Sequence, residues 1–122
     1  MKKYGKKTWL IADAYFDSKS NHQPSHESVC VLNASNEDAT IKMTLYFEDK
    51  PRMRGFAATC GAGRTHHIRM DKIKSKNNET VPQDVPYAIL VESDIPVVVQ
   101  YTRLDTAQAE MALMTTMAYP VV

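Results

Sequence analysis

The stretch IPVVVQYTRLDT, residues Ile95–Thr106, decides how we interpret the rest of the chain. It opens with the β-branched run Val97–Val99, which is typical of a strand buried on both faces. Polar side chains follow, and because side chains alternate along a strand, Tyr101, Arg103 and Asp105 are expected to share one face. A guanidinium group that follows such an apolar run needs an acid or a ligand as its partner.

Two interpretations of this stretch stay open. In the first, the strand leaves the core and ends in an exposed Arg103–Asp105 pair. In the second, the strand carries hydrogen-bonding groups, Gln100 among them, into a polar pocket. Composition alone favours the first interpretation, because acids at strand ends are usually solvated.

The composition is ordinary for a globular protein. Of 122 residues, 43% are hydrophobic and 24% are charged, and the net charge is +1. We therefore expect one domain over residues 1–122. The small net charge argues against nucleic acid as a partner. We interpret the four lysines near the N-terminus as part of a solvated segment that precedes the first strand; they are Lys2, Lys3, Lys6 and Lys7.

The N-terminal lysines and the apolar run after them imitate a signal peptide. Asp13 interrupts the run early, and no clear cleavage site follows. No apolar stretch approaches the length of a membrane span, so we expect a cytoplasmic protein without membrane insertion. Cys30 and Cys60 fit buried free thiols, although a single bridge between them stays open.

Alternating apolar residues predict seven or eight short strands. The tail, residues 106–122, would also suit a helix, but its threonines and Tyr119 favour a strand from about Met111. The clearest strand is Ala39–Phe47, with Ile41, Met43 and Leu45 on one face. The other strands are expected at Thr8–Phe16, His26–Asn33, Gly55–Cys60, Arg64–Met70, Tyr87–Glu92, in Ile95–Thr106, and from about Met111 onward. This pattern predicts an all-β fold, a single-domain antiparallel β-sandwich or a barrel.

The segments between these strands carry turn residues. We expect a loop at Asp17–Ser25, a turn at Gly61–Gly63 and a corner at Ser93–Pro96. The long polar stretch Asp71–Pro86 lacks apolar periodicity, and connections of this length are often functional or mobile. In the first strand, an inner face is expected from Trp9, Ile11 and Tyr15.

Residues for catalysis or metal binding are sparse. His66 and His67 are adjacent, so they point to opposite faces of a strand, and a metal site from His26, His67 and Asp105 could arise only through folding. Neither cysteine has an activating base beside it in the sequence, and no serine lies in a GxSxG elbow. We expect no metal, no other cofactor and no enzymatic activity. The acids, Glu27 included, are expected to be solvated at strand ends.

Polar residues within strand-like runs are the candidate functional residues. Their hydroxyl, imidazole and guanidinium groups suit a polar small ligand, and aromatic rings could stack on a sugar. A subunit interface is the alternative, and both can hold at once. The candidates from the sequence pattern are His26, Glu27, Thr65, His67, Arg69, Gln100, Tyr101 and Arg103.

Three separated segments resemble the sensory rhodopsin transducer family, in the right order over Thr8–Tyr119. They are SHESVCVLNA, RTHHIRM, and IPVVVQYTRLDTAQAE with the following MALMTTMAY. The resemblance implies a jelly-roll-like antiparallel β-sandwich that assembles as a homotetramer and senses or signals without catalysis. It also implies binding of sugars or related metabolites, and it adds Arg64 and Asp105 to the candidate residues.

We therefore expect a non-enzymatic signalling protein of this type that binds a small sugar-like ligand. The alternative is a protein-interaction adaptor for a membrane receptor or a transcriptional regulator. A fully paired network of arginines and acids would favour the adaptor.

Overall fold

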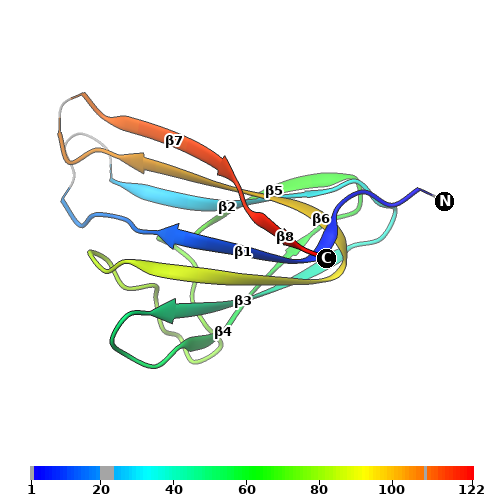
Figure 1. Ribbon diagram of the computed structural model, residues 1–122, viewed down its shortest axis with the longest axis horizontal. Helices are drawn as coiled ribbons and strands as arrows, with labels where there is room; N and C mark the ends of the chain where they lie inside the picture. The colour runs from blue at the N-terminus through cyan, green and yellow to red at the C-terminus, as the bar shows by residue number, and fades with distance from the viewer. Residues whose placement is uncertain (1, 20–23, 109) are drawn as a thin grey trace.

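The longest element of the computed structural model is β6, Tyr87–Asp105, which takes part in two sheets (Figure 1). The structure describes residues 2–19, 24–108 and 110–122. The other strands of this part are β1 (Lys6–Ala14), β2 (His26–Asn33), β3 (Ala39–Phe47), β4 (Met53–Cys60), β5 (Arg64–Arg69), β7 (Ala112–Met117) and β8 (Tyr119–Val121). No helix occurs among these residues, so the predicted all-β fold is confirmed.

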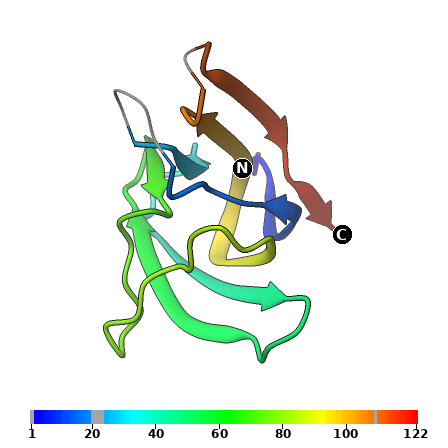
Figure 2. The same ribbon diagram turned by 90° about the vertical axis from the view of Figure 1, so that its left-hand side faces the viewer.

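The strand pairs in the described part of the chain are all antiparallel and form a β-sandwich. The first half of β6 lies between β1 and β3, in the order β4-β3-β6-β1-β8. The second half lies between β2 and β7, and β5 pairs with the far side of β2. In Figures 1 and 2, β7 runs along the opposite side of the molecule from β3 and β4.

The core lies between the two sheets and follows the predicted alternation. Ile41, Met43 and Leu45 of β3 are almost fully buried, and Val29 and Val31 of β2 face them from the other sheet. Val97 and Val99 are fully buried, whereas Val98 is partly exposed and packs against the core from its edge. The prediction of burial on both faces is therefore wrong at Val98.

The predicted corner at Ser93–Pro96 is wrong, because β6 runs through it. This segment is where β6 leaves one sheet and enters the other: Ser93 pairs with Ile41 of β3, and Val98 pairs with Leu32 of β2. The Asp94 carboxylate accepts a hydrogen bond from the Thr40 amide at 2.8 Å. A side chain thus replaces a ladder bond at the crossing.

The remaining strand boundaries differ by a few residues. A register shift between Ile11 and Ala14 reverses the expected alternation in β1, so Ala14 and Phe16 are buried and Tyr15 is only half-buried. The strands β4 and β5 begin or end within two residues of the prediction, and the tail forms two strands. In the predicted loop Asp17–Ser25, residues 20–23 lie outside the described part.

Candidate functional site

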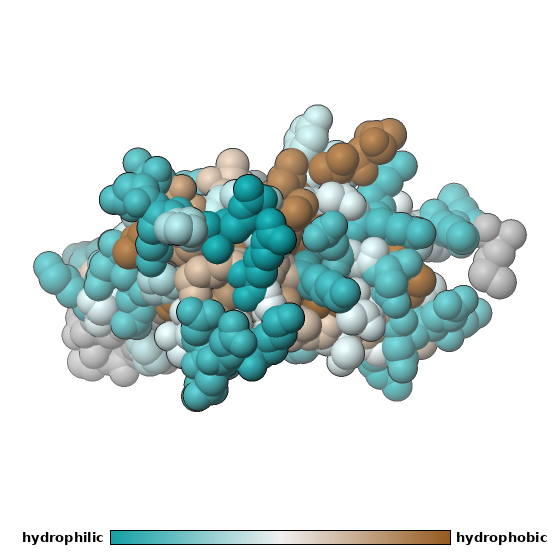
Figure 3. Space-filling model, turned by 90° about the horizontal axis from the view of Figure 1, so that it is seen from below, coloured by the Kyte–Doolittle hydropathy of each residue, from teal (hydrophilic) through white to brown (hydrophobic). Residues whose placement is uncertain are grey.

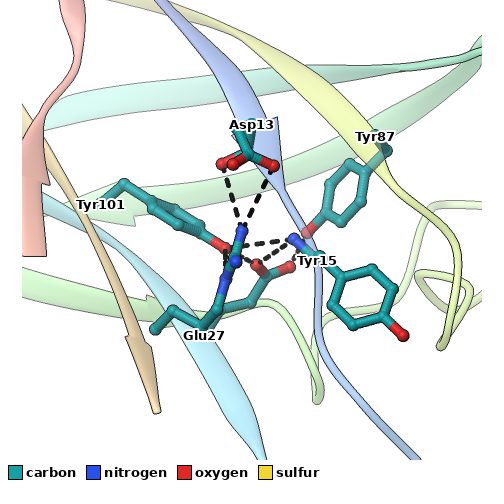
Figure 4. A network of polar contacts seen from close by, with 6 residues as sticks. Asp13, Tyr15, Glu27, Tyr87 and Tyr101 are labelled. Carbon is teal, nitrogen blue, oxygen red and sulfur yellow. Dashed lines mark hydrogen bonds and ion pairs between the residues drawn. The ribbon is translucent and has the colours of Figure 1, made fainter. Parts of the chain in front are cut away.

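A buried carboxylate, Glu27, lies at the centre of a polar network inside the sandwich (Figure 4). Glu27 continues the inward-facing row of β2 that contains Val29 and Val31, so alternation places its side chain in the core. Its exposed fraction is 0%. The expectation of a solvated acid at a strand end is therefore wrong for Glu27.

Three donors satisfy the Glu27 carboxylate. Tyr87 donates its hydroxyl to Oε1, and Tyr101 donates its hydroxyl to Oε2. The Tyr15 backbone amide donates to Oε2 at 3.0 Å. Figure 4 shows the Tyr87 and Tyr101 rings approaching the carboxylate from opposite sides, while the Tyr15 ring turns away from it.

Arg103 connects this buried network to the surface. Its Nε donates to the Tyr101 hydroxyl oxygen at 3.2 Å, and its side chain is 21% exposed. One terminal nitrogen lies 3.5 Å from Oδ1 of Asp13, a carboxylate that is 80% exposed. The guanidinium also lies over the rings of Tyr15 and Tyr101, at 6.0 and 5.6 Å from their centroids.

The favoured interpretation, an exposed Arg103–Asp105 pair, is therefore wrong, and another acid, Asp13, is the partner of Arg103. Asp105 instead accepts a hydrogen bond from the Ala107 amide at 2.9 Å and caps its own turn. Arg103 contacts Asp13, which comes from β1 rather than from the same strand. The strand is not an isolated exposed end, because its polar groups enter a network shared with β1 and β2.

Burial governs the electrostatics of this site. Burial raises the pKa of Glu27, although the two tyrosine hydroxyls, the Tyr15 amide and Arg103 act in the opposite direction. The pKa values of Tyr87 and Tyr101 are also raised, first by burial and then by the neighbouring Glu27 charge. Both phenols therefore stay protonated and act as donors to the carboxylate.

The network links four chain segments and is complete by itself. It joins the residue after β1, the start of β2, and both the beginning and the later part of β6. Among the described residues, no buried side-chain nitrogen or oxygen lacks a hydrogen-bond partner. The chain therefore satisfies these groups without a guest molecule, as expected for a structural network.

The ten candidate residues do not converge on one cavity. Paired residues of antiparallel strands share a face, so the registers of β2, β5 and β6 divide the candidates between two faces. The outer face of this sheet carries His26, Thr65, His67, Arg69 and Gln100. The inner face carries Glu27, Arg64, Tyr101, Arg103 and Asp105.

The outer candidates have local partners or face solvent. Arg69 donates two hydrogen bonds of 2.7 Å to the two oxygens of Asp71. Thr65 donates to the Val31 carbonyl at 3.1 Å. His67 and Gln100 are exposed. In the described part of the chain, Arg69 and Arg103, the two arginines identified from the strand pattern, thus each contact a carboxylate of the same chain.

The remaining candidates lie at strand ends. His26 Nδ1 lies 3.1 Å from the Pro24 carbonyl oxygen, and Arg64 is exposed and donates to the Gly63 carbonyl at 3.3 Å. Their predicted roles in ligand binding stay predictions. Among residues 2–19, 24–108 and 110–122, no group of three or more histidines, cysteines or acids is arranged to hold a metal ion.

Sequence reasoning missed Tyr87, Asp13 and Asp71. Tyr87 is the first residue of β6, and its side chain points to the same buried side of the strand as those of Ile89 and Val91. Alternation along the strand could therefore have identified it as a buried hydroxyl. The pairing of Asp13 with Arg103 depends on the register shift in β1, which no local pattern indicates.

A second feature of the surface is an apolar ribbon formed by residues 111–122, which we call the β7–β8 ribbon. All six residues of β7 are exposed, among them Leu113 at 73% and Met117 at 52%. Tyr119 of β8 is 69% exposed and lies opposite Leu10 of β1. Within the described residues, β7 pairs with β6 alone and β8 with β1 alone, so each ribbon strand forms a sheet edge.

Comparisons with known proteins agree with this architecture. A family model described as "Anabaena sensory rhodopsin transducer" matches residues 4–120. The chain belongs to this family. The resemblance noted in the sequence is thereby confirmed. No match was found among curated protein sequences.

Two solved structures are similar to this chain. The first, "Crystal Structure of Thermotoga maritima 1070", is 33% identical with a TM-score of 0.85, and the match covers 96% of each chain. The second, "Anabaena sensory rhodopsin transducer", is 34% identical with a TM-score of 0.75, covering 84% of this chain and 100% of that one. Within the described residues, no helix is long and apolar enough to cross a membrane.

Proposed function

We propose that this chain is a non-enzymatic signalling adaptor that acts by docking to other protein chains through the β7–β8 ribbon. The observation that carries the proposal is the concentration of exposed apolar side chains in that ribbon. Leu113, Met117 and Tyr119 are each more than half exposed. Monomeric proteins rarely expose large contiguous apolar patches, and such patches commonly mark interaction sites.

The backbone of the ribbon supports the same proposal. An edge strand presents unpaired amides and carbonyls, and natural proteins usually protect such edges with charges, prolines or bulges. The β7 sequence ALMTTM has no charge and no proline. A second chain that pairs with β7 would therefore satisfy its backbone and cover Leu113 or Met114 in one step.

The completeness of the polar network favours an adaptor over a ligand-binding domain. Arg69 is paired with Asp71, and Arg103 contacts Asp13 and Tyr101, so neither guanidinium needs a guest molecule. The similar protein from Anabaena is named a sensory rhodopsin transducer. By analogy, we propose that this chain passes a signal between a receptor and a downstream protein.

We also propose that the first partner is a second copy of this chain, with a tetramer as the expected assembly. The cytoplasm is the proposed location, because Cys30 and Cys60 are both free thiols, which suits a reducing compartment. The apolar ribbon would then be covered in the assembled protein.

The test is the mass of the protein in solution, measured by size-exclusion chromatography with light scattering. We expect an oligomer for the unmodified chain and a monomer for the double variant Leu113→Glu/Met117→Glu, since two charges would enter the apolar contact. The control is Thr59→Glu/Gln83→Glu, which adds the same charge at exposed positions outside the ribbon. A monomeric unmodified chain, or equal loss in both variants, would contradict the proposal.

A second candidate function is binding of a small sugar-like ligand, and it has one supporting observation. The half-buried Tyr15 ring lies beside the partly exposed Arg103 and the exposed Asp13. An aromatic face next to hydrogen-bonding groups suits a sugar. A thermal-shift screen of sugars against the protein and its Tyr15→Leu variant tests it. If no sugar raises the melting temperature of the unmodified protein, this function fails.

A further inference from the structure

A hollow of about 530 Å³ lies on the outer face of the β4-β3-β6 sheet, and none of its lining residues belongs to the β7–β8 ribbon or to the Glu27 network. Its lining comes from β3, the turn after β3, β4, the first half of β6 and the polar connection after β5. Figure 3 views the molecule from the side of β3 and β4 and shows hydrophilic side chains gathered there. We call this feature the basic hollow, for the charges described below.

A β-bulge shapes the basic hollow. The pairing of β3 with β4 shifts register between Met43 and Leu45, and Gly55 has a φ of +89°, which favours glycine. A Cβ atom at Gly55 would lie 3.1 Å from Cγ of Lys76, so the stem of Lys76 occupies the space that a side chain would fill. The Lys76 amide also donates to the Gly55 carbonyl at 3.0 Å.

Four cations and one acid line the basic hollow. The cations are Lys42, Arg52, Arg54 and Lys76, and the acid is Glu92. Glu92 lies opposite Lys42 in the ladder but forms no ion pair with it within 4 Å. Neither ion pair of the described residues includes any of the four cations. The hollow therefore carries an excess of positive charge, which attracts an anion.

The cations surround groups that suit a polypeptide. Arg52 lies over the ring of Tyr46, 5.4 Å from its centroid, which holds the guanidinium at the edge of the hollow. Thr44 and Tyr46 supply hydroxyls, while Leu90 supplies apolar surface. A mixture of hydroxyl, apolar and cationic groups matches an extended segment in which acids alternate with small or apolar residues.

Shape and charge favour a peptide over other anions. The hollow lies across an exposed sheet face and does not enclose a ligand, whereas small-molecule sites usually bury most of the ligand surface. Nucleic acid would bring phosphates against Glu92, and the whole chain carries a net charge of only +1. An acidic peptide can place its carboxylates beside the lysines and arginines and leave a neutral residue at Glu92.

We propose that the basic hollow binds an extended acidic segment of a partner protein. This site shares no lining residue with the β7–β8 ribbon, although β8 belongs to the same sheet, with β1 between β8 and β6. Its contribution would be partner selection, because complementary charges mainly set specificity and association rate.

The test uses a fluorescent peptide of about eight alternating glutamates and threonines, long enough to cross three strands when extended. Fluorescence anisotropy at low ionic strength should show saturable binding that weakens with added salt. The variant Lys42→Glu/Arg54→Glu should weaken binding by about tenfold or more. The control Lys7→Glu/Lys72→Glu makes the same change of net charge at exposed positions outside the hollow and should change the affinity less than about twofold.

Three outcomes would overturn the proposal. The first is absence of saturable binding by the acidic peptide. The second is an equal loss of affinity in the hollow variant and its control, since that reports only net charge. The third is that oligothymidine or phosphatidylglycerol vesicles bind more tightly than the peptide, and that Lys42→Glu/Arg54→Glu abolishes this binding. All variants should keep the oligomeric mass of the unmodified protein, which separates this test from that of the ribbon.

Discussion

Replacing Glu27 by leucine tests whether the buried network is structural. The substitution leaves the hydroxyls of Tyr87 and Tyr101 without their acceptor, while the Tyr15 amide keeps only its bond to the Tyr101 hydroxyl oxygen at 3.2 Å. A buried donor that loses its acceptor costs about 1–3 kcal/mol, and breaking a buried charged network by removing one member costs about 3–5 kcal/mol. We expect a loss of about 4 kcal/mol, a large share of the usual stability of a small domain.

Urea unfolding followed by tryptophan fluorescence measures this loss. The chain has a single tryptophan, Trp9, which is 4% exposed and donates its ring N–H to the carbonyls of Lys6 and Val97. Its emission should change as the sandwich opens. With a urea m-value of about 1.5–2 kcal/mol/M, the midpoint should fall by about 2–3 M without a change in slope.

A double-mutant cycle with Tyr87→Phe is the control. Once Glu27 is leucine, removing the Tyr87 hydroxyl should cost less than in the unmodified chain, because that hydroxyl has already lost its acceptor. A midpoint shift below about 0.5 M for Glu27→Leu would refute the reasoning. The carboxylate would then be free to serve a ligand rather than required for folding.

Three further predictions concern titration and packing. Burial raises the pKa of Glu27 in the folded state. The stability that the protonated Glu27 side chain contributes is therefore fully present below its pKa in the unfolded chain, about 4.3, and is lost as the pH rises through its pKa in the folded state. The urea midpoint of Glu27→Gln should therefore improve relative to the unmodified chain as the pH rises above the unfolded value, and a relative decline would contradict the sign. Gly5→Ala should destabilise the protein by about 3 kcal/mol, because the new Cβ would lie 2.0 Å from the Val97 carbonyl oxygen at a φ of +95°; unchanged melting would exclude this contact. Burial raises the pKa of the Cys60 thiol, so Cys60 should react with a thiol reagent much more slowly than the partly exposed Cys30, and equal labelling by mass spectrometry would show that Cys60 is accessible.

Local alternation was sufficient to predict most of the fold. The bounds of β2 and β3 agree with the prediction, because apolar residues alternate strictly along Ala39–Phe47 and the turns around both strands are rich in asparagine and aspartate. The continuity of β6 was not predictable in this way. Pro96 and Asp94 indicate a corner locally, and only the change of partner from β3 to β2 explains why the strand continues.

The candidate site was predictable in part. Alternation correctly placed Tyr101 and Arg103 on one face, and it would have placed Glu27 in the same row as Val29. The convergence of Tyr87 on Glu27 was not predictable from local patterns. It depends on pairing between segments 60 residues apart in the chain.

The distinction between pocket and structural network depends on the same long-range pairing. The sequence shows which polar groups enter strands, but it does not show which groups meet. Arg69 has its acid two residues away, whereas Arg103 contacts one that is 90 residues distant. Only the second pairing required the structure.

Docking of other chains along the β7–β8 ribbon is the basis of the function proposed for this chain. Its sharpest test is hydrogen–deuterium exchange of the full chain, compared between the unmodified protein and Leu113→Glu/Met117→Glu. We predict slow exchange of the β7 amides that do not bond to β6, because a docked chain would pair with them, and fast exchange of the same amides once the variant is monomeric. Fast exchange of these edge amides in the unmodified protein at every concentration would contradict this proposal.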